Sequence, residues 1–190
     1  LIHTGSFLVP RFNDMCRAAM PEVEIFTIID DSLIKNTIAA DRLTPLTSRR
    51  LAGYITSAED AGADAVLVTC SSVGPAVEAA RPFVRIPVLR VDEPMAEQAV
   101  RLACSIGIIA TLSTTLEPTR ALVQARADAR GRKVTIRTHL CRGAFEAVSS
   151  GNSTTHDRIV RQGLMELMEQ CDVIVLAQAS MARVVDTLSE

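Results

Sequence analysis

The chain has 190 residues, a formal net charge of −2 and 48% hydrophobic residues, with a mean hydropathy of +0.23. This length fits one large domain or two small ones, and the charge offers no basic footprint for nucleic acid. No apolar run reaches the length of a membrane span, and five scattered cysteines without a CxxC pair indicate reduced thiols in a cytoplasmic protein, not a zinc site or a disulfide framework.

Short apolar runs alternate with longer amphipathic stretches, which is the pattern of βα units around a parallel sheet. In chain order, the predicted strands are residues 1–3, 24–29, 64–69, 88–91, 105–110, 133–138 and 172–176. The predicted helices are residues 47–61, one beginning near 73–75, one opened by 92–93, and residues 115–129, 156–169 and 179–188. The strands are apolar nearly throughout, as in sheets covered by helices on both faces.

Two kinds of signal mark the ends of these elements. Gly62 follows the helix at 47–61, and Gly131 follows the helix at 115–129, where glycine is a common stop. Pro118 is expected in the first turn of the latter helix, where a missing N–H is harmless. The chain opens at Leu1 inside a predicted strand, so we expect native residues to precede it.

Polar turns follow four of the predicted strands, at residues 3–6, 68–72, 110–115 and 176–181. In open α/β sheets, ligands bind at the carboxyl ends of the strands, so these turns predict one polar pocket. The helix openings after Cys70 and Ser113 would direct backbone N–H groups at an anion. A carboxylate is the expected ligand.

Cys70 is the first candidate for chemistry. It ends a buried strand and stands just before a helix, and a helix start favours the thiolate form of a cysteine. The alternative is that this thiol is a small buried apolar group. For the other four cysteines, the apolar role is expected.

Four motifs in sequence order resemble the aspartate/glutamate/hydantoin racemase superfamily. They are TCSSVGPAVEAAR at 69–81, PVLRVDEPM at 87–95, IGIIATLSTT at 106–115 and LAQASM at 176–181. The resemblance implies an α/β fold of two pseudo-symmetric Rossmann-like lobes, each a mostly parallel sheet flanked by helices, with the active site in the inter-lobe cleft. It places the first lobe at residues 1–93 and the second at 94–181, with a C-terminal helix at 182–190 that can pack back on the first lobe.

The resemblance also implies a homo-oligomeric, cofactor-independent racemase or isomerase. Such an enzyme moves a proton at the carbon next to a carboxylate, in an amino acid, a hydantoin or a related small acid. In the family, two cysteines face each other across the substrate. Cys70 matches the first, but Gln178 stands at the position of the second, and an amide is not an acid or base.

This departure leaves several readings open. Cys70 can act alone, with a water, or with His3 opposite it. The chain can instead be a one-cysteine decarboxylase, lyase or cis–trans isomerase. Cys70 can also be a nucleophile while Gln178 orients a carboxylate through its amide N–H groups. The last alternative is a catalytically silent domain that binds small anions.

The expected substrate-binding residues share two properties: they lie in the polar turns, and they carry small or hydrogen-bonding side chains. They are Thr4, Gly5, Thr69, Ser71, Ser72, Thr111, Ser113, Thr114, Gln178 and Ala179. The Thr111–Thr114 turn is assigned to a substrate carboxylate by resemblance, with ordinary helix capping as the alternative. His139 and His156 are expected to be structural or at the surface, and no glycine-rich nucleotide motif is present.

Overall fold

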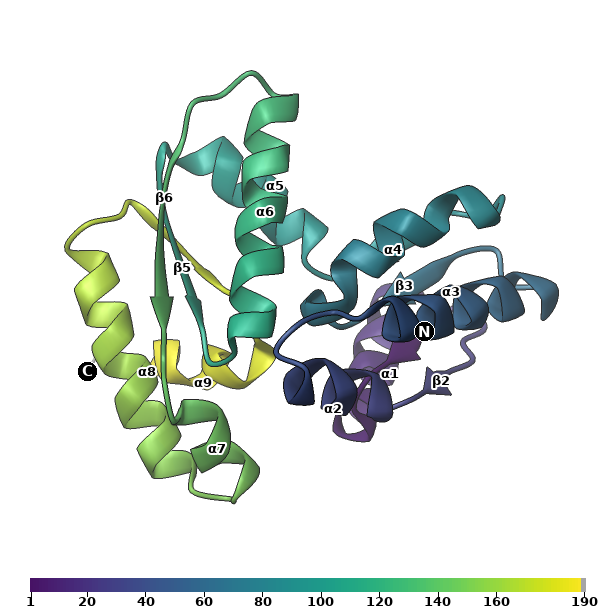
Figure 1. Cartoon of the computed structure of the whole chain (residues 1–190), viewed down its shortest axis with the longest axis horizontal. Coiled ribbons are helices and arrows are strands. Elements are labelled where there is room, and N and C mark those ends of the chain that lie inside the picture. Colours follow the sequence, from purple (N-terminus) through teal and green to yellow (C-terminus); the bar gives the residue numbers. More distant parts are fainter. Residues whose placement is uncertain (189–190) are drawn as a thin grey trace. The chain divides into compact units, whose positions relative to one another are not determined.

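A computed structural model describes residues 1–188. The chain divides into two compact units, Leu1–Val91 and Asp92–Glu190. Each unit is a parallel sheet with helices packed against it (Figure 1). No helix among the described residues is long and apolar enough to cross a membrane.

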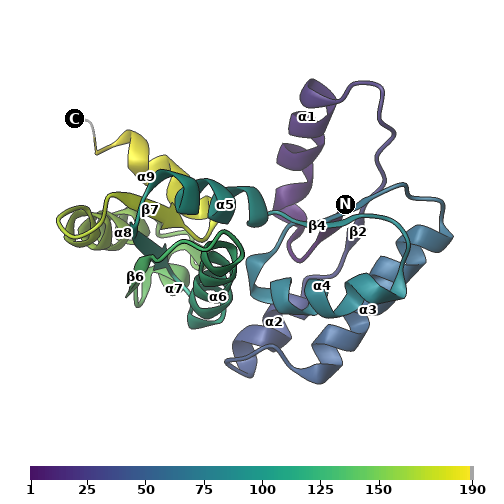
Figure 2. The ribbon, with the colours of Figure 1, turned by 90° about the horizontal axis from the view of Figure 1, so that it is seen from above.

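The first unit holds a four-stranded parallel sheet in the order β2-β1-β3-β4. Its strands are β1 (Ile2–His3), β2 (Ile28–Ile29), β3 (Val66–Val68) and β4 (Val88–Arg90). Its helices are α1 (Val9–Ala19), α2 (Ser32–Ala39), α3 (Pro45–Asp60) and α4 (Gly74–Ala80), with short 3₁₀ turns η1 (Ser6–Leu8), η2 (Ser71–Val73) and η3 (Arg81–Phe83). Figure 2 shows α1 on the opposite side of this sheet from α3 and α4.

The core of the first unit forms between the sheet and the α3–α4 side. Val66 and Val68 are two residues apart in β3, so both side chains point to this side of the sheet. There they pack with Leu51 and Ile55 of α3. The two α3 residues are four apart and share one helix face. Thr44 caps α3 by accepting a hydrogen bond from the backbone N–H of Thr47, and proline at the first helical position fits this start.

The second unit holds a three-stranded parallel sheet in the order β6-β5-β7. Its strands are β5 (Ser105–Ala110), β6 (Thr135–Leu140) and β7 (Val173–Leu176). Its helices are α5 (Glu93–Leu102), α6 (Ser113–Ala129), α7 (Ala144–Ser149), α8 (Ser153–Met168) and α9 (Ala182–Asp186), and the 3₁₀ turn η4 (Ala179–Met181) precedes α9. Figure 1 shows α6 and α8 on opposite sides of β5.

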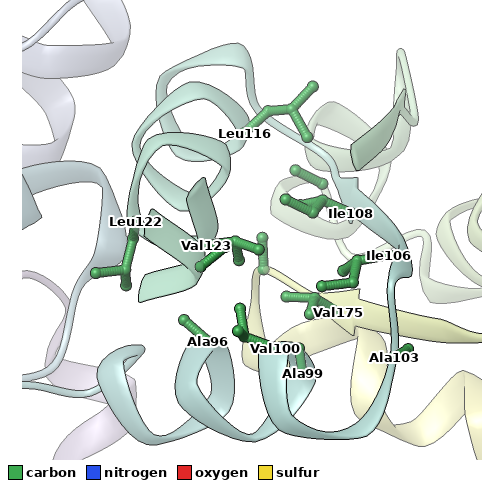
Figure 3. Packing of buried hydrophobic residues seen from close by; sticks show 13 residues of the cluster. Ala96, Ala99, Val100, Ala103, Ile106, Ile108, Leu116, Leu122, Val123 and Val175 are labelled. Atoms are coloured by element: carbon green, nitrogen blue, oxygen red, sulfur yellow. The ribbon is translucent and has the colours of Figure 1, made fainter. Parts of the chain in front are cut away.

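Side chains that alternate between the two faces of β5 contribute to two separate hydrophobic cores. Ile106 and Ile108 face the α5–α6 side and pack with Val100 and Val123 (Figure 3). Ile109 follows Ile108 and points to the opposite face of the sheet, where it joins the core on the α8 side with Val160. Burial on both faces explains why this strand is apolar throughout.

All seven predicted strands are present: β5 has the predicted bounds, and the other six are shorter or shifted. The strand expected at 24–29 is only Ile28–Ile29, because this edge strand pairs with β1 alone. The strand expected at 133–138 is Thr135–Leu140, since all six of its residues are in register with β5.

The helices differ more from expectation. The helix α6 begins at Ser113 because the backbone N–H groups of Thr115 and Leu116 already bond to the carbonyl of Leu112. Pro118 therefore lies inside the helix, and the prediction of its first-turn position is wrong. The helices α1, α2 and α7 were not predicted; α2 and α7 have only eight and six residues, too few to show a helical period clearly.

The end of the chain is helical over a shorter stretch than expected. The helix α9 ends at Asp186, and residues 189–190 of the predicted helix lie outside the described residues. Val184 of α9 packs into the core on the α8 side of the second unit. Arg183 bonds to the carboxylate of Asp157 on α8 at 2.8 Å, so α9 is joined to α8 by packing and by charge.

Candidate functional site

In both units, the direction in which the chain winds reverses beside the first strand. Connections from β1 lead to β2 on one side and onward to β3 on the other. In the second unit, β6 and β7 flank β5 in the same way. Such a reversal point is where open α/β sheets bind ligands, at the carboxyl ends of the strands.

Cys70 stands at the reversal point of the first unit, two residues after β3. It adopts an extended backbone, with φ −133° and ψ 116°, and η2 begins with the next residue. Its side chain is half-buried, and the thiol makes no hydrogen bond to any described residue. Ser71 and Ser72 form the turn itself and are buried.

His3 and Thr69 join the ends of β1 and β3. The His3 Nδ1 atom lies 2.7 Å from the Thr69 Oγ1 atom, and this hydroxyl is also within 3.3 Å of the Ile2 carbonyl oxygen. The two contacts are satisfied together when His3 donates from Nδ1 and Thr69 donates to Ile2. Burial lowers the pKa of His3, and its Nε2 atom has no partner among the described residues.

Thr4 and Gly5 follow β1 and are both buried. The Phe7 ring lies over Gly5, so a Cβ atom at position 5 would stand 2.6 Å from that ring. The ring itself is 81% exposed. Glycine at position 5 therefore permits the close approach of an aromatic side chain.

Arg90, at the end of β4, is a functional candidate that the sequence reasoning missed. Its side chain is only 5% exposed, and Nη1 lies 3.4 Å from a carboxylate oxygen of Glu78. The guanidinium fills the space where a Cβ atom of Gly74 would stand. Arg90 thus braces the start of α4, four residues after Cys70; an arginine inside an apolar strand was the available signal.

A second missed cluster lies at the end of β2, around the Asp30 carboxylate. It accepts hydrogen bonds from the Ser32 hydroxyl at 2.6 Å, the Tyr54 hydroxyl at 2.7 Å and Arg50 at 2.5 Å. Desolvation alone would raise the pKa of Asp30, but these hydrogen bonds and the Arg50 charge outweigh it and lower the pKa. The cluster anchors the start of α2 to α3.

Gln178 stands at the reversal point of the second unit, two residues after β7. Its Oε1 atom accepts hydrogen bonds from the Thr111 backbone N–H at 2.6 Å and from the Thr111 hydroxyl at 3.0 Å. Thr111 is buried, Gln178 is half-buried, and Ala179, which begins η4, is exposed. The two sequence-predicted residues are therefore in direct contact.

Ser113 and Thr114 open α6. The helix has 17 residues, and its N-cap residue, Leu112, makes no side-chain capping hydrogen bond. Ser113 is half-buried, whereas Thr114 is buried and its Oγ1 atom has no described partner. A free buried hydroxyl in the first helical turn is a candidate hydrogen-bond donor to an anion.

Cys70 and Gln178 occupy equivalent places in their units. The backbone N–H of Thr69 bonds to Ile2 at 3.1 Å, and that of Ala177 bonds to Ile109 at 3.0 Å. The next residue in each case has an extended backbone and precedes a 3₁₀ turn. The two units are thus internally similar at the position where one carries a thiol and the other an amide.

The remaining cysteines are placed differently. Cys104 is exposed and precedes β5, at the opposite edge of the sheet from Gln178. Cys141 is buried in the core on the α8 side, and desolvation raises the pKa of its thiol to about 11. Within residues 1–188, no cluster of three or more His, Cys, Asp or Glu side chains is arranged to hold a metal ion.

The family model for Asp/Glu/Hydantoin racemases matches residues 2–190. The chain belongs to the Asp/Glu/hydantoin racemase family. A search of the curated proteins found no match.

Solved structures share the fold of this racemase-family chain. Glutamate racemase isoform RacE1 from Bacillus anthracis aligns with a TM-score of 0.67 and 18% identity, over 98% of this chain and 69% of its own. Glutamate racemase from Francisella tularensis, solved with D-glutamate, gives 0.70 and 15%, over 97% and 72%. Allantoin racemase from Klebsiella pneumoniae gives 0.62 and 18%, over 99% and 76%.

Proposed function

We propose that this racemase-family chain is a cofactor-independent enzyme in which Cys70 transfers a proton at the carbon next to a carboxylate. The proposal is carried by the position of Cys70 after β3, half-buried and beside the reversal point of its sheet. Its thiol forms no disulfide and no hydrogen bond to any described residue, so it is available to a substrate. Ser71 and Ser72 come directly after Cys70 in the chain, and we assign to their backbone N–H groups the binding of a substrate oxygen.

The proton transfer is simple to write. The thiolate of Cys70 takes the proton from the α-carbon, so a C–H bond breaks, an S–H bond forms, and the electron pair moves into the carboxylate as an enolate. Return of a proton from water to the opposite face inverts the centre. Backbone donors near the enolate oxygen stabilise the charge that develops.

A second candidate reaction is decarboxylation of a substituted malonate. It is favoured by Gln178, which stands at the position equivalent to Cys70 in its own unit and carries an amide that is neither an acid nor a base. In this case the C–C bond breaks, carbon dioxide leaves, and the Cys70 thiol protonates the resulting enolate. One thiol is sufficient for this step, whereas two-base racemisation requires a second acid.

Isotope exchange separates these candidates. Amino acids, 5-substituted hydantoins and substituted malonates are incubated with the protein in deuterated water, and products are followed by NMR and mass spectrometry. Racemisation predicts deuterium at the α-carbon with the carbon skeleton intact, and decarboxylation predicts deuterium with loss of carbon dioxide.

The Cys70→Ala variant should abolish either reaction, and Cys104→Ala, at an exposed thiol on the other edge of its sheet, should leave it unchanged. Neither exchange nor decarboxylation across all three compound classes would remove the catalytic proposal. Ligand binding without turnover, equal in the wild type and Cys70→Ala, would support a silent anion-binding domain instead.

A further inference from the structure

Phe7, in the turn η1 after β1, is an exposed aromatic residue whose ring lies against the backbone of Gly5. Phe7 is 81% exposed, and a Cβ atom at position 5 would stand 2.6, 3.1 and 3.4 Å from three of its ring carbons. The backbone of Gly5 is extended, with φ −159° and ψ 122°, a conformation open to residues with a side chain. The ring therefore explains the glycine, and the backbone conformation does not.

This arrangement adds little to the stability of the first unit. An exposed ring lacks most of the stabilisation that burial of a phenylalanine supplies. Glycine at a position that another residue could occupy increases the conformational entropy of the unfolded chain. Packing inside the unit accounts for neither residue, so we look for a ligand that the ring contacts.

The ring lies beyond the end of the strand that neighbours the Cys70 strand. The strands β1 and β3 are adjacent and parallel, and the 2.7 Å contact between His3 and Thr69 joins their ends. Cys70 comes one residue after Thr69, and Gly5 comes two residues after His3. Neighbouring strands lie about 4.8 Å apart, so one small molecule can meet both the Cys70 thiol and the ring over Gly5, within the first unit alone.

The charges at the other two strand ends of this unit favour a neutral substituent on that molecule. At the end of β2, Arg50 pairs with Asp30 at 2.5 Å. At the end of β4, Arg90 lies 3.4 Å from Glu78. Both guanidinium groups are thus engaged by carboxylates of the protein itself, whereas the Phe7 ring offers apolar surface.

We propose that Phe7 is a specificity-determining residue whose ring packs against an aromatic substituent on the α-carbon of the substrate, and that Gly5 is the residue that positions the ring. The inference rests on the proposed function, because this substrate is the compound on which Cys70 acts. It assigns a substrate class: small acids with a benzyl-like substituent, in place of acids that carry a second carboxylate there.

The test uses pairs of acids that differ only in the substituent. Calorimetry on the full chain compares phenylalanine with alanine, and benzylmalonate with methylmalonate; glutamate is the charged counterpart of phenylalanine. The wild type should bind each benzyl compound roughly 10-fold or more tightly than its methyl partner, and phenylalanine more tightly than glutamate. Phe7→Ala should lose most of this preference while the affinities for alanine and methylmalonate stay within about twofold of the wild type.

Two further variants test the position of the ring. In Gly5→Ala the new carbon displaces the exposed ring, so the preference should fall although Phe7 is still present. Phe7→Trp should keep the preference, and because the chain has no other tryptophan, its fluorescence should respond to phenylalanine and not to alanine. Phe83→Ala is the matched control: Phe83 is 68% exposed but lies in η3, before β4, at the opposite edge of the sheet, and its removal should change nothing.

Three results would overturn the inference. They are a benzyl-over-methyl preference in Phe7→Ala within twofold of the wild type, tighter binding of glutamate than of phenylalanine, and no binding of either benzyl compound. A change of oligomeric state in Phe7→Ala with an unchanged preference is a case of the first result, and it would assign the ring to a contact between two copies of the chain.

A failure of the proposed function looks different. The wild type would then show the benzyl preference, and Phe7→Ala would lose it, but neither deuterium exchange nor decarboxylation would occur with any compound. That result would remove the catalytic role of Cys70 and would still support recognition by Phe7.

Discussion

The His3 imidazole and the Thr69 hydroxyl form a 2.7 Å contact between residues that are 66 positions apart in the chain. Both side chains are buried, and the pair joins β1 to β3 one residue before Cys70. The equivalent edge of the second unit is joined by Thr111 and Gln178. Side-chain hydrogen bonds therefore cross the reversal point of each unit, but the Cys70 thiol takes no part in those of the first unit, whereas the Gln178 amide accepts those of the second.

Removing the Thr69 hydroxyl should destabilise the first unit. Thr69→Val keeps the shape but leaves Nδ1 of the buried His3 without its partner, at a cost of about 1–3 kcal/mol. Thr69→Ser retains the hydroxyl and should cost less. Urea unfolding of the two variants measures the difference, and equal stabilities would show that the contact contributes nothing.

Adding a methyl group at Gly74 should also destabilise this unit. A Cβ atom there meets the guanidinium of Arg90, whose 5% exposure leaves it little room to move. We expect Gly74→Ala to cost about 1–3 kcal/mol, as overpacking usually does.

Gly53→Ala is the matched control for this substitution. Gly53 lies in α3 with nothing within 4 Å of the added carbon, so alanine should stabilise the helix by up to about 1 kcal/mol. A Gly74→Ala protein as stable as Gly53→Ala in thermal unfolding would contradict the assignment of Arg90 as a brace.

The Asp30 cluster should make the free energy of unfolding depend on pH in the acidic range. The folded-state pKa of Asp30 is lowered, so the unfolded chain binds the proton first as the pH falls. Its contribution is present above the unfolded value of about 3.9 and is lost as the pH falls through the folded pKa, at no more than about 1.4 kcal/mol per pH unit.

Urea unfolding between pH 6 and pH 3 measures this dependence. The stability difference between wild type and Asp30→Asn should shrink toward the acid end of the series. Asp64→Asn, at an exposed carboxylate, is the control and should follow the wild type. A constant difference between wild type and Asp30→Asn at every pH would refute the prediction.

The cysteines should differ sharply in reactivity. With a pKa of about 11, roughly one part in a thousand of the Cys141 thiol is ionised at pH 8, and the side chain is buried. Iodoacetamide at pH 8 should therefore modify the exposed Cys104 and spare Cys141, as read by peptide mass spectrometry. In guanidinium chloride both should react, and equal rates in the native protein would show that Cys141 is accessible.

The local pattern of the sequence was enough to predict where the strands lie and that Cys70 follows one of them. The run at 105–110 is apolar because both faces of β5 are covered, and that property is written in consecutive residues. The polar turns at 68–72 and 176–181 are also runs of consecutive residues, so they too can be recognised in the sequence. These signals also placed Cys70 and Gln178 at the ends of β3 and β7.

Elements with weak local signals were not predicted. The helices α2 and α7 have only eight and six residues, so each offers about two turns in which a helical period could be detected. The bounds of β2 and β6 were set by the strand beside each of them, through the backbone ladders with β1 and β5. The strand propensity of a segment does not tell which other strand will pair with it, so it does not set the bounds of that strand.

The sequence by itself determined that a cysteine and a glutamine follow two buried strands, each before a turn. Only the tertiary structure decided what each side chain contacts. The Thr111–Gln178 bond joins residues 67 positions apart, and it exists because β5 and β7 are neighbours in the sheet. Strand order is a property of the packed sheet, so the polarity of the Gln178 amide, and the freedom of the Cys70 thiol, could be read only from the fold.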